Sequence, residues 1–315
     1  RRDPPDVPPV VPAPQTWSYR SSVQPLVLPG GLGYRRPGSD EGVRLGSDPV
    51  ANAAVDAAWR QLGGTRLPKG VREVVIRGND EGEALVGLVA TSPQRTLLQY
   101  AHDLLVAGTI VGVIHAPYDS RGRFRGGSER LAGRRHIEQA YGDLRLTVNV
   151  SSFAQPNPAA ASGLYRELQE LAGSGERALE LFAGSGAIAF HLAGSFGSVE
   201  AVEIDRGSIA RGRADAERLG IDNVTFTGAD ARKLARLPDA QLIAVDPPRA
   251  GLAKELRQAL KRSSADRLIY VSCDPATWAR DVADFTGSGW RLVHAQPYDF
   301  YPHTHHVEML SLLQR

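Results

Sequence analysis

Hydrophobic and polar residues follow two different patterns in the two halves of the chain. In the first half, apolar and polar residues alternate with period two in REVVIRG (72–78) and EALVGLVAT (83–91). The polar turn NDEG separates these segments, so they predict a β-hairpin. Shorter apolar runs, VQPLVL and GLGYRR, flank a Pro-Gly-Gly turn and predict two further strands.

Two helices and another strand complete the first half. DPVANAAVDAAWRQLGG (48–64) begins with capping residues and ends with glycines, and SPQRTLLQYAHDLLVAG (92–108) has the same helical character. TIVGVIHAPYD (109–119) predicts a strand. We expect residues 16–150 to form a small α+β domain with an antiparallel sheet, preceded by an extended Pro-rich tail or linker at 1–15.

The second half alternates helices with short, fully apolar strands. Such strands are typical of a parallel sheet covered by helices on both faces, so residues 151–315 predict a doubly wound α/β domain. Ligands of this fold class bind at the carboxyl ends of the strands. The predicted strands lie in RALELFAG (177–184), SVEAVEID (198–205), VTFTGAD (224–230), LIAVDPP (242–248) and RLIYVSC (267–273).

Composition narrows the classes of protein. The chain has 315 residues, 42% hydrophobic and 23% charged, and no apolar run approaches the roughly 20 residues that cross a membrane. Its single cysteine, Cys273, excludes an internal disulfide and any cluster or zinc site built on several thiolates. With no signal-peptide pattern at its start, we expect a cytoplasmic protein without a membrane partner.

A glycine-rich turn after the first strand of this domain predicts a cofactor site. In LELFAGSGAIAFHLA (179–193), Gly184 and Gly186 allow a sharp turn into a helix. Glu203 and Asp230 end the next two strands, where carboxylates can accept ribose hydroxyls. A dinucleotide and a bare structural turn are the alternatives, but the missing third glycine favours S-adenosylmethionine (SAM).

Three later segments add reactive side chains at the same rim. Asp246 ends a strand before two prolines, which hold the backbone rigidly. Cys273 ends the next strand, and Glu308 precedes the apolar terminal strand. A thiol and carboxylates at one sheet edge indicate nucleophilic and acid–base chemistry.

The order of five motifs resembles that of the SAM-dependent RNA 5-methyluridine methyltransferases. The resemblance covers the chain from about residue 126 to the end, and the segment SYRSSVQPLVL…GYRR resembles that family's central domain more loosely. The motifs are Phe153-Ala154-Gln155-Pro156-Asn157, L-F-x-G-x-G, D-P-P-R-x-G, S-C-x-P-x-T and P-H-T-x-H-V-E.

The resemblance implies a class I SAM-methyltransferase fold and an enzyme that methylates carbon 5 of uridine. By family position, Cys273 is the nucleophile that adds to carbon 6 and Glu308 is the base that removes the carbon-5 proton. Cofactor contacts are implied, beside the glycines, for Gln155, Phe182, Glu203, Asp230 and Asp246. Asp246 and Gln155 are alternatively contacts to the uracil edge. We expect a monomer acting on RNA, 23S ribosomal RNA first and the uracil-54 loop of transfer RNA second.

Several positions depart from the family pattern. Asp274 replaces the usual asparagine after the cysteine, and a neighbouring anion is expected to raise the pKa of the thiol. Ala187 replaces an asparagine after the glycine turn, and the four cysteines of an iron–sulfur cluster are absent. A degenerate RNA-binding module and an exocyclic-nitrogen methyltransferase are the alternatives; Arg249 and Cys273 argue against the second.

Two further segments carry candidate chemistry. SRGRFRGGSERLAGRR (120–135) places six arginines around Phe124 and predicts either an RNA-binding loop or a solvated one. A weaker RNA candidate consists of aromatic and basic residues of the first half, Tyr19, Arg20, Tyr34, Arg35 and Arg36. His303, His305 and His306 are expected to shape the base pocket rather than to bind a metal.

Overall fold

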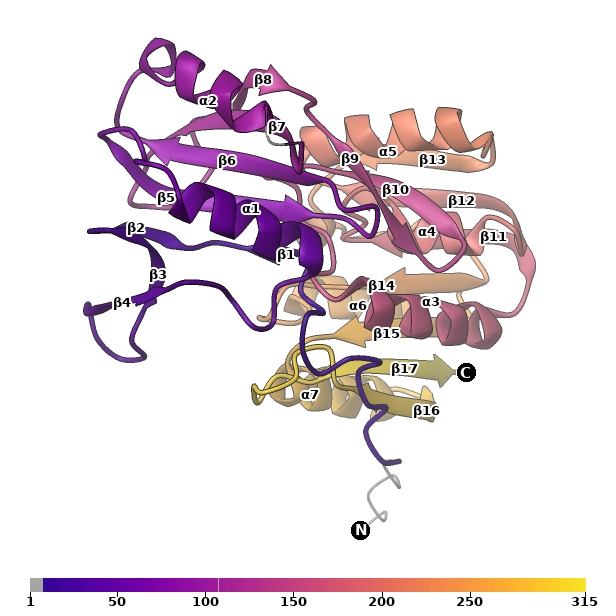
Figure 1. Ribbon diagram of the computed structural model, residues 1–315. Coiled ribbons are helices and arrows are strands. Elements are labelled where there is room, and N and C mark those ends of the chain that lie inside the picture. The colour runs from indigo at the N-terminus through magenta and orange to yellow at the C-terminus, as the bar shows by residue number, and fades with distance from the viewer. Residues whose placement is uncertain (1–7, 107) are drawn as a thin grey trace. The chain divides into compact units, whose positions relative to one another are not determined.

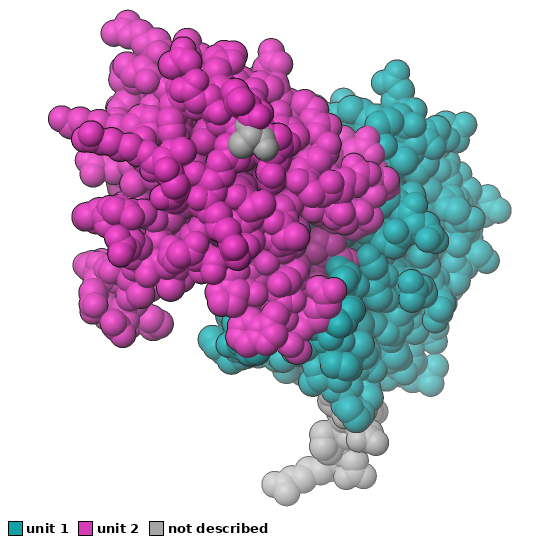
Figure 2. Space-filling model, in the orientation of Figure 1, with its two compact units in different colours: residues 1–14, 141–144, 159–315 teal, residues 15–140, 145–158 magenta. Residues whose placement is uncertain are grey.

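Two separate β-sheets organise the chain, one in each of two units (Figures 1 and 2). The computed structural model describes residues 8–106 and 108–315. Unit 1 comprises residues 1–14, 141–144 and 159–315, and unit 2 comprises residues 15–140 and 145–158. Residues 1–7 of the predicted Pro-rich tail lie outside the described residues, and Val11 bridges Tyr298 within unit 1.

Unit 2 is built on an eight-stranded sheet with the order β4-β3-β2-β5-β6-β7-β8, in which β1 pairs with β5. The predicted hairpin is present as β5 and β6, with Ile76 opposite Val86. The strands are β1 (Ser22–Val23), β2 (Leu26–Leu28), β3 (Gly31–Arg35), β4 (Gly42–Leu45), β5 (Val71–Gly78), β6 (Ala84–Ala90), β7 (Ile110–Pro117) and β8 (Glu129–Gly133).

The expectation of a wholly antiparallel sheet is wrong at one pairing. β6 and β7 run parallel, with Val86 opposite Val113. A 3-10 turn, η1 (Gln94–Thr96), and the helix α2 (Leu98–Leu105) lie between them in the chain. Such a helical crossover returns the chain to the same end of the sheet, which makes the next strand parallel.

The other predicted helix of unit 2, α1 (Ala53–Gly63), is defined by its caps and its apolar face. The Asn52 side chain accepts a hydrogen bond from the Val55 amide at 2.9 Å, and Gly64 ends the helix. Its buried face, which includes Val55, Trp59 and Leu62, joins the apolar core of the unit. A short hairpin, β9 (Ile137–Tyr141) and β10 (Leu144–Val148), follows; its turn belongs to unit 1.

Unit 1 contains the predicted doubly wound sheet, with the order β13-β12-β11-β14-β15-β17-β16. The first five of these strands are parallel, and β17 is inserted antiparallel between β15 and β16. The strands are β11 (Gly175–Leu181), β12 (Phe196–Glu203), β13 (Val224–Gly228), β14 (Leu242–Val245), β15 (Arg267–Ser272), β16 (Arg291–Tyr298) and β17 (Glu308–Gln314).

The strand order of unit 1 places a ligand site at a defined point. The chain runs outward from β11 through β12 to β13, then returns to the other side of β11 with β14. At such a reversal the loops leave in opposite directions and open a crevice at the carboxyl ends of the strands. The helices of the unit are α3 (Pro158–Ala172), α4 (Ala187–Leu192), α5 (Arg206–Leu219), α6 (Lys254–Arg262) and α7 (Pro275–Thr286), with the 3-10 turn η2 (Ala231–Lys233).

Within the described part of the chain, no helix combines the length and the apolar character needed to cross a membrane.

Candidate active site

The glycine turn between β11 and α4 has the conformation that its sequence requires. Gly184 and Gly186 have φ values of +56° and +87°, in the left-handed region that favours glycine. A Cβ atom on Gly186 would lie 2.6 Å from the Phe226 ring, so no larger residue fits. Phe182 also has a positive φ, +63°, which is unusual for a side chain of this size and marks a strained backbone next to the crevice.

Two carboxylates hold this turn in place. The Glu203 side chain accepts hydrogen bonds from the amides of Gly184 at 2.9 Å, Ile204 at 2.7 Å and Asp205 at 2.8 Å. Glu180 is 2% exposed, and its Oε2 accepts the Ala189 amide at 2.8 Å. Burial raises the pKa of Glu180 well above its usual range. Glu180 was not among the predicted site residues, although a carboxylate inside an otherwise apolar strand indicates a residue with a special role.

The close packing that a third glycine would provide comes from another helix. Gly212 of α5 faces the Phe226 ring, and a Cβ atom there would lie 2.8 Å from the Ser185 carbonyl oxygen. The turn and α5 can therefore approach each other although the turn itself ends in Ala187. The role of Gly212 was not predictable from the sequence, because Ser185, which it contacts, lies 27 residues away in the chain.

Three of the predicted cofactor residues line one pocket. Phe182, Glu203 and Asp230 surround a cavity of about 240 Å³ at the ends of β11, β12 and β13, together with Arg232 and Pro248. Arg232 contacts both Asp230 oxygens, at 2.8 and 2.9 Å, and these hydrogen bonds lower the pKa of Asp230. A carboxylate pair with an aromatic ring suits a ribose and a purine.

The register of the sheet brings Cys273 and Glu308 together. β15 and β17 are antiparallel, and Ser272, the last residue of β15, lies opposite Met309. Cys273 follows Ser272 directly after β15 ends, and Glu308 is the first residue of β17, next to Met309. The charge of Glu308 acts on the Cys273 thiol, which agrees with this proximity. The two predicted catalytic side chains are thus neighbours although 35 positions separate them.

Asp246 directly follows the adjacent strand β14 and, with Glu308, places two carboxylates near Cys273. Burial raises the pKa of Asp246 to about 7. Glu308 is 2% exposed, and burial followed by the charge of Asp246 raises the pKa of Glu308 well above its usual range. Burial, then Glu308 and Asp246, also raise the pKa of the half-buried Cys273 thiol, while Arg249 lowers it.

Asp274 has a structural task rather than the role expected for it. Its side chain accepts the Thr277 amide at 2.8 Å and caps α7, and these backbone hydrogen bonds lower its own pKa. The anions that raise the pKa of the Cys273 thiol are Glu308 and Asp246. The largest charge effects on the pKa of the thiol thus come from residues distant in the chain.

A buried aspartate fixes the loop that follows Asp246. Asp281 of α7 is fully buried, and its Oδ2 accepts the Leu252 amide and the Tyr270 hydroxyl, both at 2.8 Å. Arg257 contacts Asp281 at 3.1 Å and the Leu252 carbonyl oxygen at 2.6 Å. This network ties the D-P-P-R-x-G loop to the helix that begins beside Cys273.

Gln155 and the two segments predicted to bind RNA belong to unit 2. Gln155 is 7% exposed. In the arginine-rich loop of that unit, Arg121 pairs with Asp119 at 2.8 Å and Arg123 pairs with Glu73. In the weaker RNA candidate, Tyr19 is 6% exposed and the Tyr34 hydroxyl donates to Asp48 at 2.6 Å. The expectation that the Tyr19 ring is available to RNA bases is therefore wrong.

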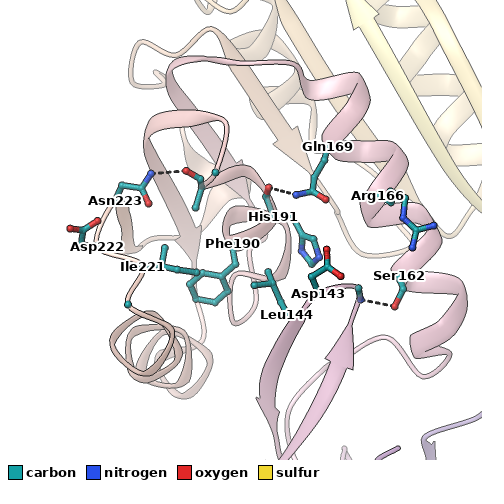
Figure 3. A pocket seen from close by; sticks show the side chains of 14 residues that line it. Asp143, Leu144, Ser162, Arg166, Gln169, Phe190, His191, Ile221, Asp222 and Asn223 are labelled. Carbon is teal, nitrogen blue, oxygen red and sulfur yellow. Dashed lines mark hydrogen bonds between the residues drawn. The ribbon is translucent and has the colours of Figure 1, made fainter.

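A larger pocket, of about 570 Å³, lies near the amino ends of β12 and β13, away from the carboxyl ends of the strands (Figure 3). Its walls include residues 193–194 and 220–223, which precede β12 and β13. Several of its polar groups bond to backbone: Asn223 donates to the Ala193 carbonyl at 2.8 Å, and Gln169 to the His191 carbonyl at 2.8 Å. These two side chains therefore cap the end of α4.

Comparisons with known proteins agree with this geometry. Residues 136–315 match the family model described as tRNA (Uracil-5-)-methyltransferase. An uncharacterized RNA methyltransferase of Thermosynechococcus vestitus is 32% identical over 97% of this chain and 73% of its own. The 23S rRNA (uracil(747)-C(5))-methyltransferase RlmC of Vibrio cholerae is 33% identical over 57% of this chain and 48% of its own.

A solved structure is similar over both units. The tRNA (uracil-54, C5)-methyltransferase of Pyrococcus abyssi, in complex with S-adenosyl-L-homocysteine, has a TM-score of 0.82 and 26% identity, covering 96% of this chain and 78% of its own. This likeness confirms the predicted α/β methyltransferase fold.

Proposed function

The chain belongs to the tRNA (uracil-5-)-methyltransferase family, and on this basis we propose that it methylates carbon 5 of one uridine in a structured RNA, with SAM as methyl donor. Membership confirms the resemblance derived from the motifs and makes the chain one of a family of RNA methyltransferases. Its relatives act on two kinds of RNA, since one is named for 23S rRNA and another for tRNA. We take 23S rRNA as the first candidate substrate and the uracil-54 loop of tRNA as the second.

The observation that carries this proposal is the proximity of Cys273 and Glu308, which lie at the paired ends of β15 and β17. Carbon 5 of uracil is a weak nucleophile until another group adds to carbon 6. A thiolate supplies that group, and a carboxylate beside it can then take the carbon-5 proton.

The side chains of this site divide the reaction between them. The Cys273 thiolate forms a bond to carbon 6 of uracil, and the displaced electrons make carbon 5 nucleophilic. Bound SAM supplies an electrophilic methyl group for carbon 5. Glu308 then accepts the carbon-5 proton. The electrons of the broken carbon–hydrogen bond restore the double bond between carbons 5 and 6 and expel the Cys273 sulfur. A raised pKa makes Glu308 a stronger base for this step.

The cofactor pocket fits the donor that this reaction needs. Glu203 would accept ribose hydroxyls, although three backbone amides already occupy much of its carboxylate. Phe182 and Asp230 would contact the adenine, and the open space beside Gly184 would accommodate the amino acid part of the cofactor. Asp246 and Gln155 would complete the site at the cofactor or at the uracil edge.

A mechanism-based substrate tests the proposal. The protein is incubated with SAM and an RNA that carries 5-fluorouridine, whose fluorine cannot leave as a proton. We expect a covalent protein–RNA complex that withstands denaturing electrophoresis and is absent from Cys273→Ala. An adduct that survives in Cys273→Ala, or no adduct with any structured RNA, would contradict the mechanism.

The same experiment separates the candidate substrates. One arm uses 23S rRNA fragments and the other uses tRNA transcripts, each with matched unfluorinated RNA as control. An adduct with rRNA alone supports the first candidate, and an adduct with tRNA alone supports the second. RNA binding in both arms without any adduct would indicate an RNA-binding module that does not catalyse methylation.

A further inference from the structure

Arg249 connects the two segments that carry Cys273 and Glu308. It follows Pro247 and Pro248 after β14, and its carbonyl oxygen accepts the Thr277 hydroxyl at 3.1 Å in the first turn of α7. Its Nη2 lies 3.4 Å from Nε2 of His306, two residues before Glu308. The backbone of this arginine is thus held to the helix after Cys273, and its side chain reaches the turn before Glu308.

Arg249 brings a positive charge to a group of side chains that are otherwise acidic. Asp246, Glu308 and the Cys273 thiolate would place three negative charges at adjoining strand ends. Arg249 lowers the pKa of Cys273 and of Glu308, against the effects of burial and of Asp246. It also lowers the pKa of Asp274, although hydrogen bonds to the α7 amides do more there. The same guanidinium therefore acts on groups at the end of β15, at the start of α7 and at the start of β17.

The contact with His306 gives Arg249 a hydrogen-bond partner. A guanidinium can only donate hydrogen bonds, so Nε2 of His306 accepts in this contact. The His306 ring packs against the Tyr301 and His305 rings, with centroids 5.9 and 4.3 Å away. This aromatic group holds the acceptor in place for Arg249.

We propose that Arg249, oriented by His306, is the positioning residue that allows Cys273 to react as a thiolate beside Asp246 and Glu308. This inference rests on the proposed function of the site and extends it to two residues outside the nucleophile and base. Lysine carries the same charge without the planar fork, so Arg249→Lys should keep part of the effect and Arg249→Ala none.

The single cysteine of the chain makes a direct test possible. The rate of alkylation by iodoacetamide, measured against pH, reports only on Cys273 and needs neither RNA nor SAM. For Arg249→Ala we expect the profile to move to higher pH and the rate near neutral pH to fall about three- to tenfold, which corresponds to half to one pKa unit. Arg249→Lys should lie between this variant and the native protein.

A control and a double variant test the roles separately. Arg262→Ala removes an equally exposed charge from the end of α6 and should leave the profile unchanged. His306→Gln retains an acceptor and should stay near native, whereas His306→Ala should weaken reactivity. The pair Arg249→Ala/His306→Ala should be no worse than Arg249→Ala alone, because His306 acts through Arg249.

Two outcomes would overturn the inference. An unchanged alkylation profile in a folded Arg249→Ala protein, with native thermal unfolding, would remove Arg249 from this role. Fully additive effects of the two alanine substitutions would remove His306. Neither result bears on methylation, because the adduct with 5-fluorouridine RNA tests that reaction separately.

Discussion

Replacing one carboxylate oxygen of Glu308 should separate methyl transfer from removal of the carbon-5 proton in the proposed reaction. Glu308→Gln keeps the shape of the side chain but cannot accept the carbon-5 proton. We expect this variant to form the methylated adduct with RNA that contains ordinary uridine and to remain covalently bound to it, so that the complex persists on a denaturing gel. Glu255→Gln, an exposed change on α6, is the matched control and should turn over normally. Free turnover by Glu308→Gln would assign the base to another residue.

Asp246 makes the stability of the protein depend on pH in a definite direction. Burial raises its pKa from 3.8 to about 7, so between these pH values the folded state holds a proton that the unfolded state has released. The free energy of unfolding therefore falls as pH rises through this window. Asp246→Asn cannot titrate, so its melting temperature should rise relative to that of the native protein as the pH increases from about 4 to about 7. Parallel melting curves for the two proteins would contradict this assignment.

At the scale of elements, the loop from Asp246 to α6 is held by close contacts at Gly251. This residue has a φ of +70°, and a Cβ atom there would lie 2.7 Å from both Asp281 Oδ2 and Arg280 Nη2. Gly220 has nearly the same φ, +67°, with nothing within 4 Å. Gly220→Ala should therefore cost only the backbone strain, about 1–2 kcal/mol, and Gly251→Ala about 2–4 kcal/mol. Equal urea midpoints for the two variants would show that the Asp281 network does not constrain the loop.

The strands were predictable from sequence wherever a local pattern defines them. Period-two alternation identified β5 and β6, and continuous apolar runs identified the parallel strands of unit 1. The direction of β7 beside β6 was not predictable, because pairing depends on residues distant in the chain. The same limit applies within the site: the motifs identify Cys273 and Glu308, but only the pairing of β15 with β17 shows that they lie close together. Asp281 escaped notice because its partners come from three separate segments.

At the scale of the whole molecule, the small net charge of +2 conceals an uneven distribution. Unit 2 carries 17 Lys and Arg residues against 12 Asp and Glu, whereas unit 1 carries 20 against 23. Non-specific attraction to a phosphate backbone comes from positive charge, so unit 2 is the favoured part of the chain for RNA binding. The acidic side chains of the proposed active site contribute to the net negative charge of unit 1.

The arginine-rich loop of unit 2 provides the test of this division. Because Arg121 and Arg123 already face Asp119 and Glu73, their phosphate contacts must compete with these acids. Replacing Arg121, Arg123 and Arg125 by Ala should still weaken RNA binding and reduce the slope of log K against log salt by up to about 2, with SAM binding intact. The control replaces three exposed arginines of unit 1, Arg166, Arg177 and Arg291, and changes the net charge equally. Equal slopes for both triple variants would mean that net charge, and not this loop, determines the attraction to RNA.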